Sequence, residues 1–168
     1  MKTGNAITNK ILTLQPLMRL VEQWRFFGKT ISFTNGCFDI LHQGHISTLV
    51  EAANNSDVLI VGLNSDDSVK KLKGESRPVN SEQSRAIMLA SLMMVDAVIV
   101  FPEETPLQLI NTILPDVLVK GGDYKLEEIV GAKEVEERGG KVIIHPLFHD
   151  FSTSAVIEKL KTTTTDTT

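Results

Sequence analysis

The amino-acid sequence predicts an α/β fold, a Rossmann-like open parallel sheet of about five strands with helices on both faces. Short apolar runs rich in valine and isoleucine recur along the chain without the alternation of a half-exposed sheet. Segments with helical spacing of apolar residues separate these runs. A chain of 168 residues, 42% of them hydrophobic, can also bury one substantial core. Such a sheet has right-handed crossovers and binds its ligand at the carboxyl ends of the strands.

The first helix and the strands can be placed from the apolar pattern. Residues 1–13 begin with a polar, unpatterned stretch and are expected to be loosely ordered. From Leu14 the apolar residues share one helical face, and Gly28 is suited to end that helix. The strands are expected at Ile31–Thr34, Val58–Leu63, Ala97–Phe101, Val117–Lys120 and Val142–His145.

Three further helices have recognisable boundaries. Asn80, three residues before Gln83, predicts a capping box. Thr105 and Pro106 predict an N-cap and a first helical position. A helix over Leu126–Arg138 is expected to end at a glycine.

The C-terminal part is expected to hold one more helix, from about Ser154 to Leu160. Residues 161–168 lack an apolar anchor and are expected to form a disordered tail. No internal repeat or interdomain linker interrupts the pattern, so residues 14–160 are expected to form a single domain.

Composition and charge narrow the functional classes. The formal net charge of −4 argues against broad nucleic-acid binding but not against a local phosphate pocket. Cys37 is the only cysteine, so neither an intrachain disulfide nor a cysteine zinc cluster is possible. The sequence has no apolar segment of membrane-spanning length and no signal-peptide core. A cytoplasmic protein without membrane or nucleic-acid partners is expected.

The stretch Asn35–His45 carries the strongest functional signal. It lies between an expected strand and an expected helix, and this order forms a phosphate-binding corner because the first amides of the helix are unsatisfied. His42 and His45 stand at the mouth of the helix, three residues apart, so both imidazoles can donate hydrogen bonds to one phosphate chain. Gly36 and Gly44 permit a close approach of the backbone to phosphate oxygens.

Five stretches, this one included, resemble in their order those of a known family. They are Asn35–His45, Gly62–Asp66, Lys73–Val79, Leu118–Tyr124 and Phe151–Ser154. Together they resemble the nucleotidyltransferases with a His-x-Gly-His motif, the cytidylyltransferase-like superfamily, and within it the adenylyltransferases that form ADP-heptose. The resemblance covers roughly residues 14–160, nearly the whole chain.

The resemblance implies which residues contact the nucleotide. In this family the two histidines contact the phosphates and stabilise the transition state, while the segment before the last helix holds the triphosphate opposite them. The expected catalytic residues are therefore His42, His45 and Lys73. The expected nucleotide-binding residues are Asn35, Gly36, Cys37, Phe38, His42, His45, Asn64, Asp66, Arg85, Ser152, Thr153 and Ser154.

Structural alternatives exist for several of these residues. The Ser152–Ser154 hydroxyls could be ordinary helix caps, and Asp66 could cap a helix too. An arginine on a helix, such as Arg85, is usually exposed to solvent. Asp39 could serve to order the turn without contacting a substrate. Cys37 is interpreted as a packed side chain rather than a nucleophile.

The basic, glycine-bearing loop Lys73–Val79 is interpreted as a mobile lid over the leaving group and the acceptor. Lys73 and Arg77 match the lid of the resembling family, whereas Lys70 and Lys71 are interpreted as surface charges. Gly121 and Gly122, which follow the strand expected at Val117–Lys120, permit a tight backbone path beside a ligand. The expected acceptor-binding residues are Arg77, Lys120, Gly121 and Asp123, although Asp123 could simply stabilise a turn.

The resemblance implies transfer of AMP from ATP to a sugar 1-phosphate, namely D-glycero-D-manno-heptose 1-phosphate, with release of pyrophosphate. Mg²⁺ would be held mainly by the substrate phosphates, because the sequence offers no carboxylate cluster. A separate sugar kinase would supply the acceptor, and a homodimer is expected.

Two other functions stay open at this point. A glycerol 3-phosphate cytidylyltransferase, or another adenylyltransferase with the same motif, would use the same fold on a different substrate. A nucleotide-binding sensor module would bind ATP without turnover.

Overall fold

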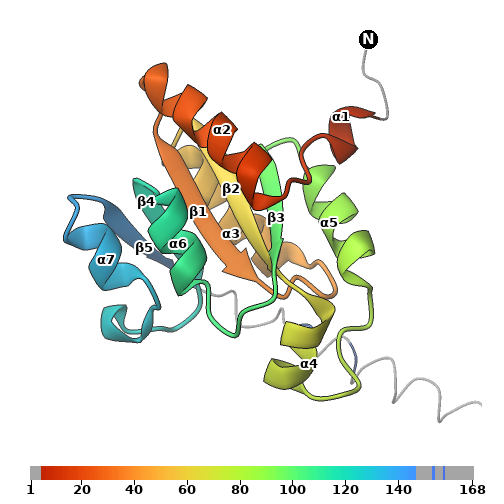
Figure 1. The fold of residues 1–168 in the computed structure, drawn as a ribbon. Coiled ribbons are helices and arrows are strands. Elements are labelled where there is room, and N and C mark those ends of the chain that lie inside the picture. Colours follow the sequence, from red (N-terminus) through yellow and green to blue (C-terminus); the bar gives the residue numbers. More distant parts are fainter. Residues whose placement is uncertain (1–4, 147–152, 154–156, 158–168) are drawn as a thin grey trace, which may run out of the picture.

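The computed structural model describes residues 5–146 together with Thr153 and Ile157 (Figure 1). Its centre is a five-stranded, fully parallel sheet with the strand order β3-β2-β1-β4-β5. The strands are β1 (Ile31–Gly36), β2 (Val58–Asn64), β3 (Ala97–Phe101), β4 (Val117–Gly121) and β5 (Lys141–His145). The predicted fold class is confirmed, and each predicted strand is found within two residues of its expected bounds.

Helices cover both faces of this sheet (Figure 1). They are α1 (Asn5–Thr8), α2 (Leu14–Phe26), α3 (Gln43–Asn54), α4 (Asp66–Lys73), α5 (Glu82–Ala90), α6 (Leu107–Ile113), the 3₁₀ helix η1 (Leu126–Glu128) and α7 (Ala132–Glu136). One core cluster joins α2, α6 and α7 to the sheet, and the other joins α3 and α5 to it. All seven residues of β2 are buried, which explains why the sequence shows no alternation there.

The sequence pattern placed two helix starts one residue too early. Ser81, not Asn80, is the N-cap of α5, and its hydroxyl accepts a hydrogen bond from the Ser84 amide. Pro106, not Thr105, occupies the N-cap position of α6. The expected capping box fails because Asn80 is engaged elsewhere: its amide and its side chain both donate to Asp39.

The helix expected over Leu126–Arg138 is two short helices. η1 ends at Glu128, and α7 begins only after Gly131, whose φ of +87° is unsuited to a continuous helix. Gly131 also lies against Ile110, so the chain bends there to bring α7 onto the sheet. Gly139, at φ +81°, follows α7 as expected.

Residues 5–13, for which the sequence predicts little order, make contacts with distant parts of the chain. They contain α1, and Ile11 forms a parallel bridge with Val98 at the free edge of β3. The Lys10 ammonium group donates to the carbonyls of Leu92 and Val95. Local sequence could not reveal these contacts, because their partners are more than 80 residues away.

Two expected features lie outside the described residues: most of the helix from about Ser154 to Leu160, and the tail of residues 161–168. Within the described part of the chain, no helix combines the length and the apolar character needed to cross a membrane.

Candidate active site

A cavity of about 580 Å³ opens at the carboxyl ends of the strands, where a parallel sheet of this kind binds its ligand. The turn between β1 and α3 forms its floor, since seven residues from Asn35 to His45 line it besides Gly44. The ends of α4 and β3 contribute one side, and the end of β4 with η1 contributes the other. The corner predicted from the sequence is therefore the centre of this cavity.

His42 and His45 face each other within this cavity. Their rings are stacked, with centroids 3.7 Å apart and planes inclined by 25°. His42 is the N-cap of α3 but makes no capping bond through its side chain. The Nδ1 atoms of both rings are buried, and among the described residues neither finds a hydrogen-bond partner. The stacked rings thus bury one nitrogen each against the protein.

Burial keeps both imidazoles neutral at physiological pH. The pKa of His42 is lowered by desolvation. The pKa of His45 is lowered to about 4, chiefly by desolvation and further by the neighbouring His42, against a small opposing effect of the Ile40 carbonyl. Protonation of both stacked imidazoles is unfavourable, because it would place two positive charges side by side. An anion beside them would reverse these effects, because it stabilises the protonated forms.

The signature turn, residues 37–42 between β1 and α3, is tightly packed at its tip. Phe38 adopts a left-handed backbone conformation, with φ at +44°, and its buried ring lies 5.1 Å from that of His45. A Cβ atom on Gly36 would come within 3.2 Å of the Phe38 ring. The glycine thus lets Phe38 fold under the turn, which supports one side of the histidine pair.

Cys37 lines the cavity as a thiol rather than a thiolate. Burial raises its pKa, and this effect outweighs the attraction of the nearby cations Lys73, Arg85, Lys120 and Arg77. The sequence interpretation of Cys37 as a packed side chain rather than a nucleophile agrees with this shift.

The end of β4 supplies a largely buried cation. The Lys120 ammonium group lies 3.2 Å from the Asn35 side-chain oxygen and 5.9 Å from the centroid of the Tyr124 ring. Desolvation is the main reason that the pKa of Lys120 is lowered. Gly121 follows directly, and a Cβ atom there would meet the Thr48 hydroxyl at 2.3 Å. Glycine is therefore required for α3 to pack against the end of β4.

The lid segment reaches the cavity with two cations. Lys73, at the end of α4, and Arg77 both belong to the lining, as does the apolar side chain of Leu72. Arg77 is fixed by Asp39, which is only 1% exposed: Nε of Arg77 lies 2.6 Å from a carboxylate oxygen of Asp39. The other carboxylate oxygen accepts from the amides of Val79 and Asn80. Asp39 thus orders the lid and not merely its own turn.

Arg85 is not where the resemblance implied. Its side chain is fully buried, outside the lining of the cavity, instead of facing a nucleotide. Its guanidinium group donates to the carbonyls of Cys37 and Asn80 and to the carboxylate of Asp66. Arg85 therefore ties the signature turn, the lid and the start of α4 together. The expectation of direct contact overlooked these three acceptors, which belong to three different segments of the chain.

The remaining predicted residues divide into three groups. Asn64 and Thr153 line the cavity, and the Thr153 hydroxyl lies 3.4 Å from the Ile40 carbonyl oxygen. Asp66 and Asp123 are outside the lining; Asp66 is instead the partner of Arg85. Ser152 and Ser154 lie outside the described residues.

Several lining residues were not anticipated. They are Thr34, Thr48, Leu72, Glu104, Thr105, Pro106, Tyr124, Glu128, Ile129 and Val130. The tyrosine belongs to a segment that the sequence had singled out, and the Thr-Pro pair was noticed only as a helix start. Nothing local distinguishes the two glutamates, because the fold alone brings their loops to the cavity.

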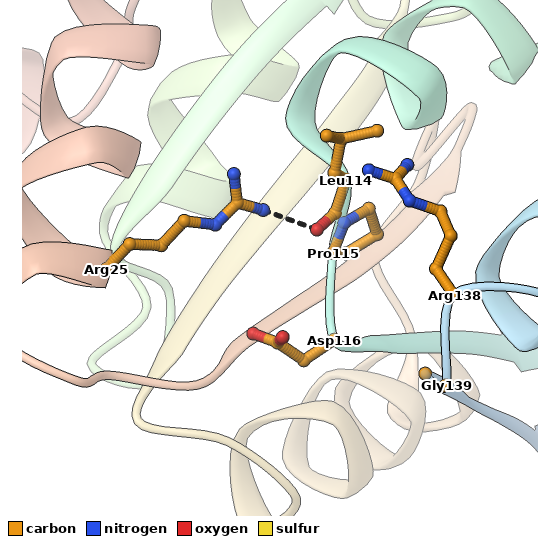
Figure 2. A pocket seen from close by; sticks show the side chains of 7 residues that line it. Arg25, Leu114, Pro115, Asp116, Arg138 and Gly139 are labelled. Carbon is orange, nitrogen blue, oxygen red and sulfur yellow. Dashed lines mark hydrogen bonds between the residues drawn. The ribbon is translucent and has the colours of Figure 1, made fainter.

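A second, smaller hollow of about 280 Å³ lies at the opposite, amino-terminal edge of the sheet (Figure 2). Arg25, Asp116 and Arg138 line it, and Arg25 donates to the carbonyl of Leu114 at the end of α6. The Asp116 carboxylate accepts from the amide of Ile31. Two of its three charged residues thus cap backbone groups at the ends of secondary-structure elements.

The open parallel sheet, with a histidine-bearing turn and cations at its carboxyl edge, defines an α/β protein of the Rossmann-like class. The sequence model of the cytidylyltransferase-like family matches residues 33–159, and the chain belongs to that family.

The curated relatives share about half of their aligned residues with this chain. The bifunctional protein HldE of Hyphomonas neptunium is 53% identical over 152 residues, which are 90% of this chain and 31% of that protein. The bifunctional protein HldE of Rhodopseudomonas palustris is 54% identical over 148 residues, 88% of this chain and 30% of that protein. The chain thus spans about a third of the length of the curated relatives it matches.

Two solved structures share the fold. A lipopolysaccharide core biosynthesis protein from Thermoplasma volcanium is 30% identical with a TM-score of 0.58, over 71% of this chain and 97% of that one. The pantoate-beta-alanine ligase of Francisella tularensis is 19% identical with a TM-score of 0.54, over 81% of this chain and 66% of that one, a likeness of fold alone.

Proposed function

We propose that this protein transfers AMP from ATP to a sugar 1-phosphate, D-glycero-D-manno-heptose 1-phosphate, and releases pyrophosphate. The observation that carries the proposal is the stacked histidine pair, which lines one cavity together with Lys73, Arg77 and Lys120. The heptose acceptor rests on the resemblance of five sequence stretches to the enzymes that form ADP-heptose. A structural relative named for lipopolysaccharide core biosynthesis supports the same acceptor.

The reaction needs charge stabilisation more than it needs a base. The sugar phosphate is mostly a dianion at neutral pH, since the second pKa of a phosphate monoester is about 6. One of its oxygens attacks the α-phosphorus of ATP in line, the bond from that phosphorus to the bridging oxygen breaks, and pyrophosphate leaves. Because no proton must be removed from the nucleophile, the protein has to position two anions and absorb developing charge.

Each group in the cavity has a role in this scheme. The neutral imidazoles of His42 and His45 donate hydrogen bonds to the oxygens of the transferred phosphoryl group. Lys73 and Arg77 neutralise charge on the pyrophosphate and on the acceptor phosphate. Thr153 lies far from the signature turn in sequence but lines the same cavity. Its hydroxyl group donates a hydrogen bond to the triphosphate.

The two sides of the cavity suit different parts of the substrates. The side formed by β4 and η1 exposes the ring of Tyr124 beside Ile129 and Val130, an apolar surface suited to the adenine base. The side formed by α4 and the loop after β3 offers Arg77, Glu104 and other polar groups suited to a sugar phosphate. We therefore assign the acceptor to this polar side.

This assignment changes part of the expectation from the sequence. The acceptor had been expected on Arg77, Lys120, Gly121 and Asp123; we keep only Arg77 there. Lys120 and Gly121 lie next to Tyr124 and are assigned to the nucleotide.

Magnesium is part of the proposal. The described residues contain no group of three His, Cys, Asp or Glu side chains arranged to hold a metal ion. The ion would be bound through ATP phosphate oxygens and water, where it neutralises phosphate charge, and Glu104 and Glu128 are the carboxylates of the lining besides Asp39. We further propose a cytoplasmic homodimer supplied with heptose 1-phosphate by a sugar kinase activity, separate from this domain.

The test is a substrate panel. The protein is incubated with Mg²⁺, one nucleoside triphosphate and one of several sugar or alcohol phosphates, and the products are identified by mass. ADP-heptose from ATP and heptose 1-phosphate is the expected result. CDP-glycerol from CTP and glycerol 3-phosphate would identify a cytidylyltransferase instead, and tight ATP binding without any product would identify a sensor module.

A further inference from the structure

The buried carboxylate of Asp39 has more bonding than a turn requires. It is the most buried acidic group of the cavity lining, at 1% exposure, and it accepts three hydrogen bonds from the segment Arg77–Asn80. Its own backbone carbonyl accepts a fourth from the Asn80 side chain, at 2.7 Å. Asp39 thus joins the signature turn directly to the lid, 38 to 41 residues away in sequence.

The way in which Asp39 holds Arg77 leaves most of the guanidinium group free. Only Nε of Arg77 is bound to the carboxylate, at 2.6 Å. An arginine has five N–H donors, and the four on the two terminal nitrogens have no partner among the described residues. The side chain is only 14% exposed, yet it lines the cavity. A long side chain that would otherwise sample many rotamers is thereby fixed with its donor-rich end at the site.

A second anchor holds the other end of the lid. The Asn80 carbonyl accepts from Nε of Arg85, and the same guanidinium group donates to the Cys37 carbonyl at 2.6 Å. Because Arg85 is fully buried, the position of Asn80 is fixed relative to the signature turn. Asp39 therefore acts on Arg77 from a rigid base.

We propose that Asp39 is a positioning residue for substrate binding: it fixes Arg77 so that the terminal nitrogens of the guanidinium group bind the phosphate of the acceptor. This inference rests on the proposed function for the identity of the anion. Arg77 is the group that touches the substrate, and Asp39 acts only through it.

The decisive variant is Asp39→Asn. The asparagine oxygen can still accept from the amides of Val79 and Asn80, but its NH₂ group then faces Nε of Arg77, donor against donor. The expected result is an increase of ten-fold or more in the KM for the sugar phosphate, with the KM for ATP changed less than three-fold. Asp67→Asn, which removes an exposed carboxylate from α4, is the matched control and should leave both constants unchanged.

A double-mutant cycle separates positioning from general structural damage. If Asp39 acts through Arg77, Asp39→Asn has less than a three-fold effect once Arg77→Ala is present. If the two losses multiply, the carboxylate does not act through the arginine and the inference is overturned. Arg77→Lys gives an independent check, because an ammonium group cannot bind Asp39 side-on and still present a fork to a phosphate. It should resemble Asp39→Asn in its selective effect on the KM of the sugar phosphate, and a normal KM would count against the inference.

A readout without catalysis keeps this inference distinct from the proposed function. Trypsin can cut after Lys73, at the start of the lid, and cleavage there reports how firmly Asp39 holds the segment. Asp39→Asn should be cut at least five-fold faster than the wild type and the Asp67→Asn control, with unchanged far-UV circular dichroism. Equal cleavage rates would overturn the inference even if the enzyme were active. Faster cleavage in a protein that forms no sugar nucleotide would instead refute only the proposed substrate.

Discussion

The neutral state of His45 should make stability depend on pH in a way that one substitution removes. In the unfolded chain His45 takes up a proton near its ordinary pKa of 6.5, whereas in the folded protein it does so only near a pKa of about 4. Between these values the unfolded state binds more protons, so the free energy of unfolding falls as the pH falls from 6.5 to 4. At 1.36 kcal/mol per pH unit, the full effect is about 3 kcal/mol.

The substitution His45→Gln removes this term. Urea denaturation at pH 7.5 and pH 4.5 should show that the wild type loses about 2 to 3 kcal/mol more than the variant does. The carboxylates titrate in both proteins and cancel in the comparison, and His42 keeps its own smaller share. His145→Gln, a histidine outside the cavity, controls for the loss of a histidine as such. Equal losses in the wild type and His45→Gln would refute the assignment of a buried, neutral imidazole.

Three further predictions concern the packing and the ligand. Gly121→Ala forces a Cβ atom to within 2.3 Å of the Thr48 hydroxyl and should cost about 1 to 3 kcal/mol of stability; adding Thr48→Ala should restore most of it in thermal unfolding, and no recovery would contradict the close approach. Arg85→Ala leaves the Asp66 carboxylate and two carbonyls without a buried donor, so chemical denaturation should show a loss of about 3 to 5 kcal/mol; a loss below 1 kcal/mol would mean that the guanidinium group is dispensable. ATP binding should raise the pKa of the histidines and take up protons near pH 6, measured by calorimetry in buffers of different ionisation enthalpy; His45→Gln should reduce the uptake, and no uptake in the wild type would exclude phosphate contact.

The sheet could be predicted from the sequence because its signal is local. Buried parallel strands read as continuous apolar runs, and β3 was found at its predicted bounds, Ala97–Phe101. The signature turn could be placed for the same reason, since its strand, glycine and helix are adjacent in the chain. The break in the helix after Glu128 could not be predicted, because the backbone at Gly131 follows from packing against Ile110.

The parts of the site that escaped prediction depend on distant partners. Arg85 reads as a surface residue of an amphipathic helix, yet its three acceptors come from three other segments and draw it into the interior. Asp39 reads as a turn residue, whereas its main partners lie about 40 residues later. Glu104 reaches the cavity only because β3 ends beside β2. Pattern can identify a phosphate corner, but the buried polar network around it depends on the tertiary fold.

The central claim, adenylyl transfer at the histidine pair, is most directly tested with heptose 1-phosphate whose non-bridging phosphate oxygens carry ¹⁸O. If the sugar phosphate attacks the α-phosphorus of ATP, mass spectrometry will find all of the label in ADP-heptose and none in pyrophosphate. His45→Ala should form this product at least about a hundred-fold more slowly, as expected for the loss of one donor to a developing charge. Label in pyrophosphate, or near-normal turnover of His45→Ala, would contradict the account.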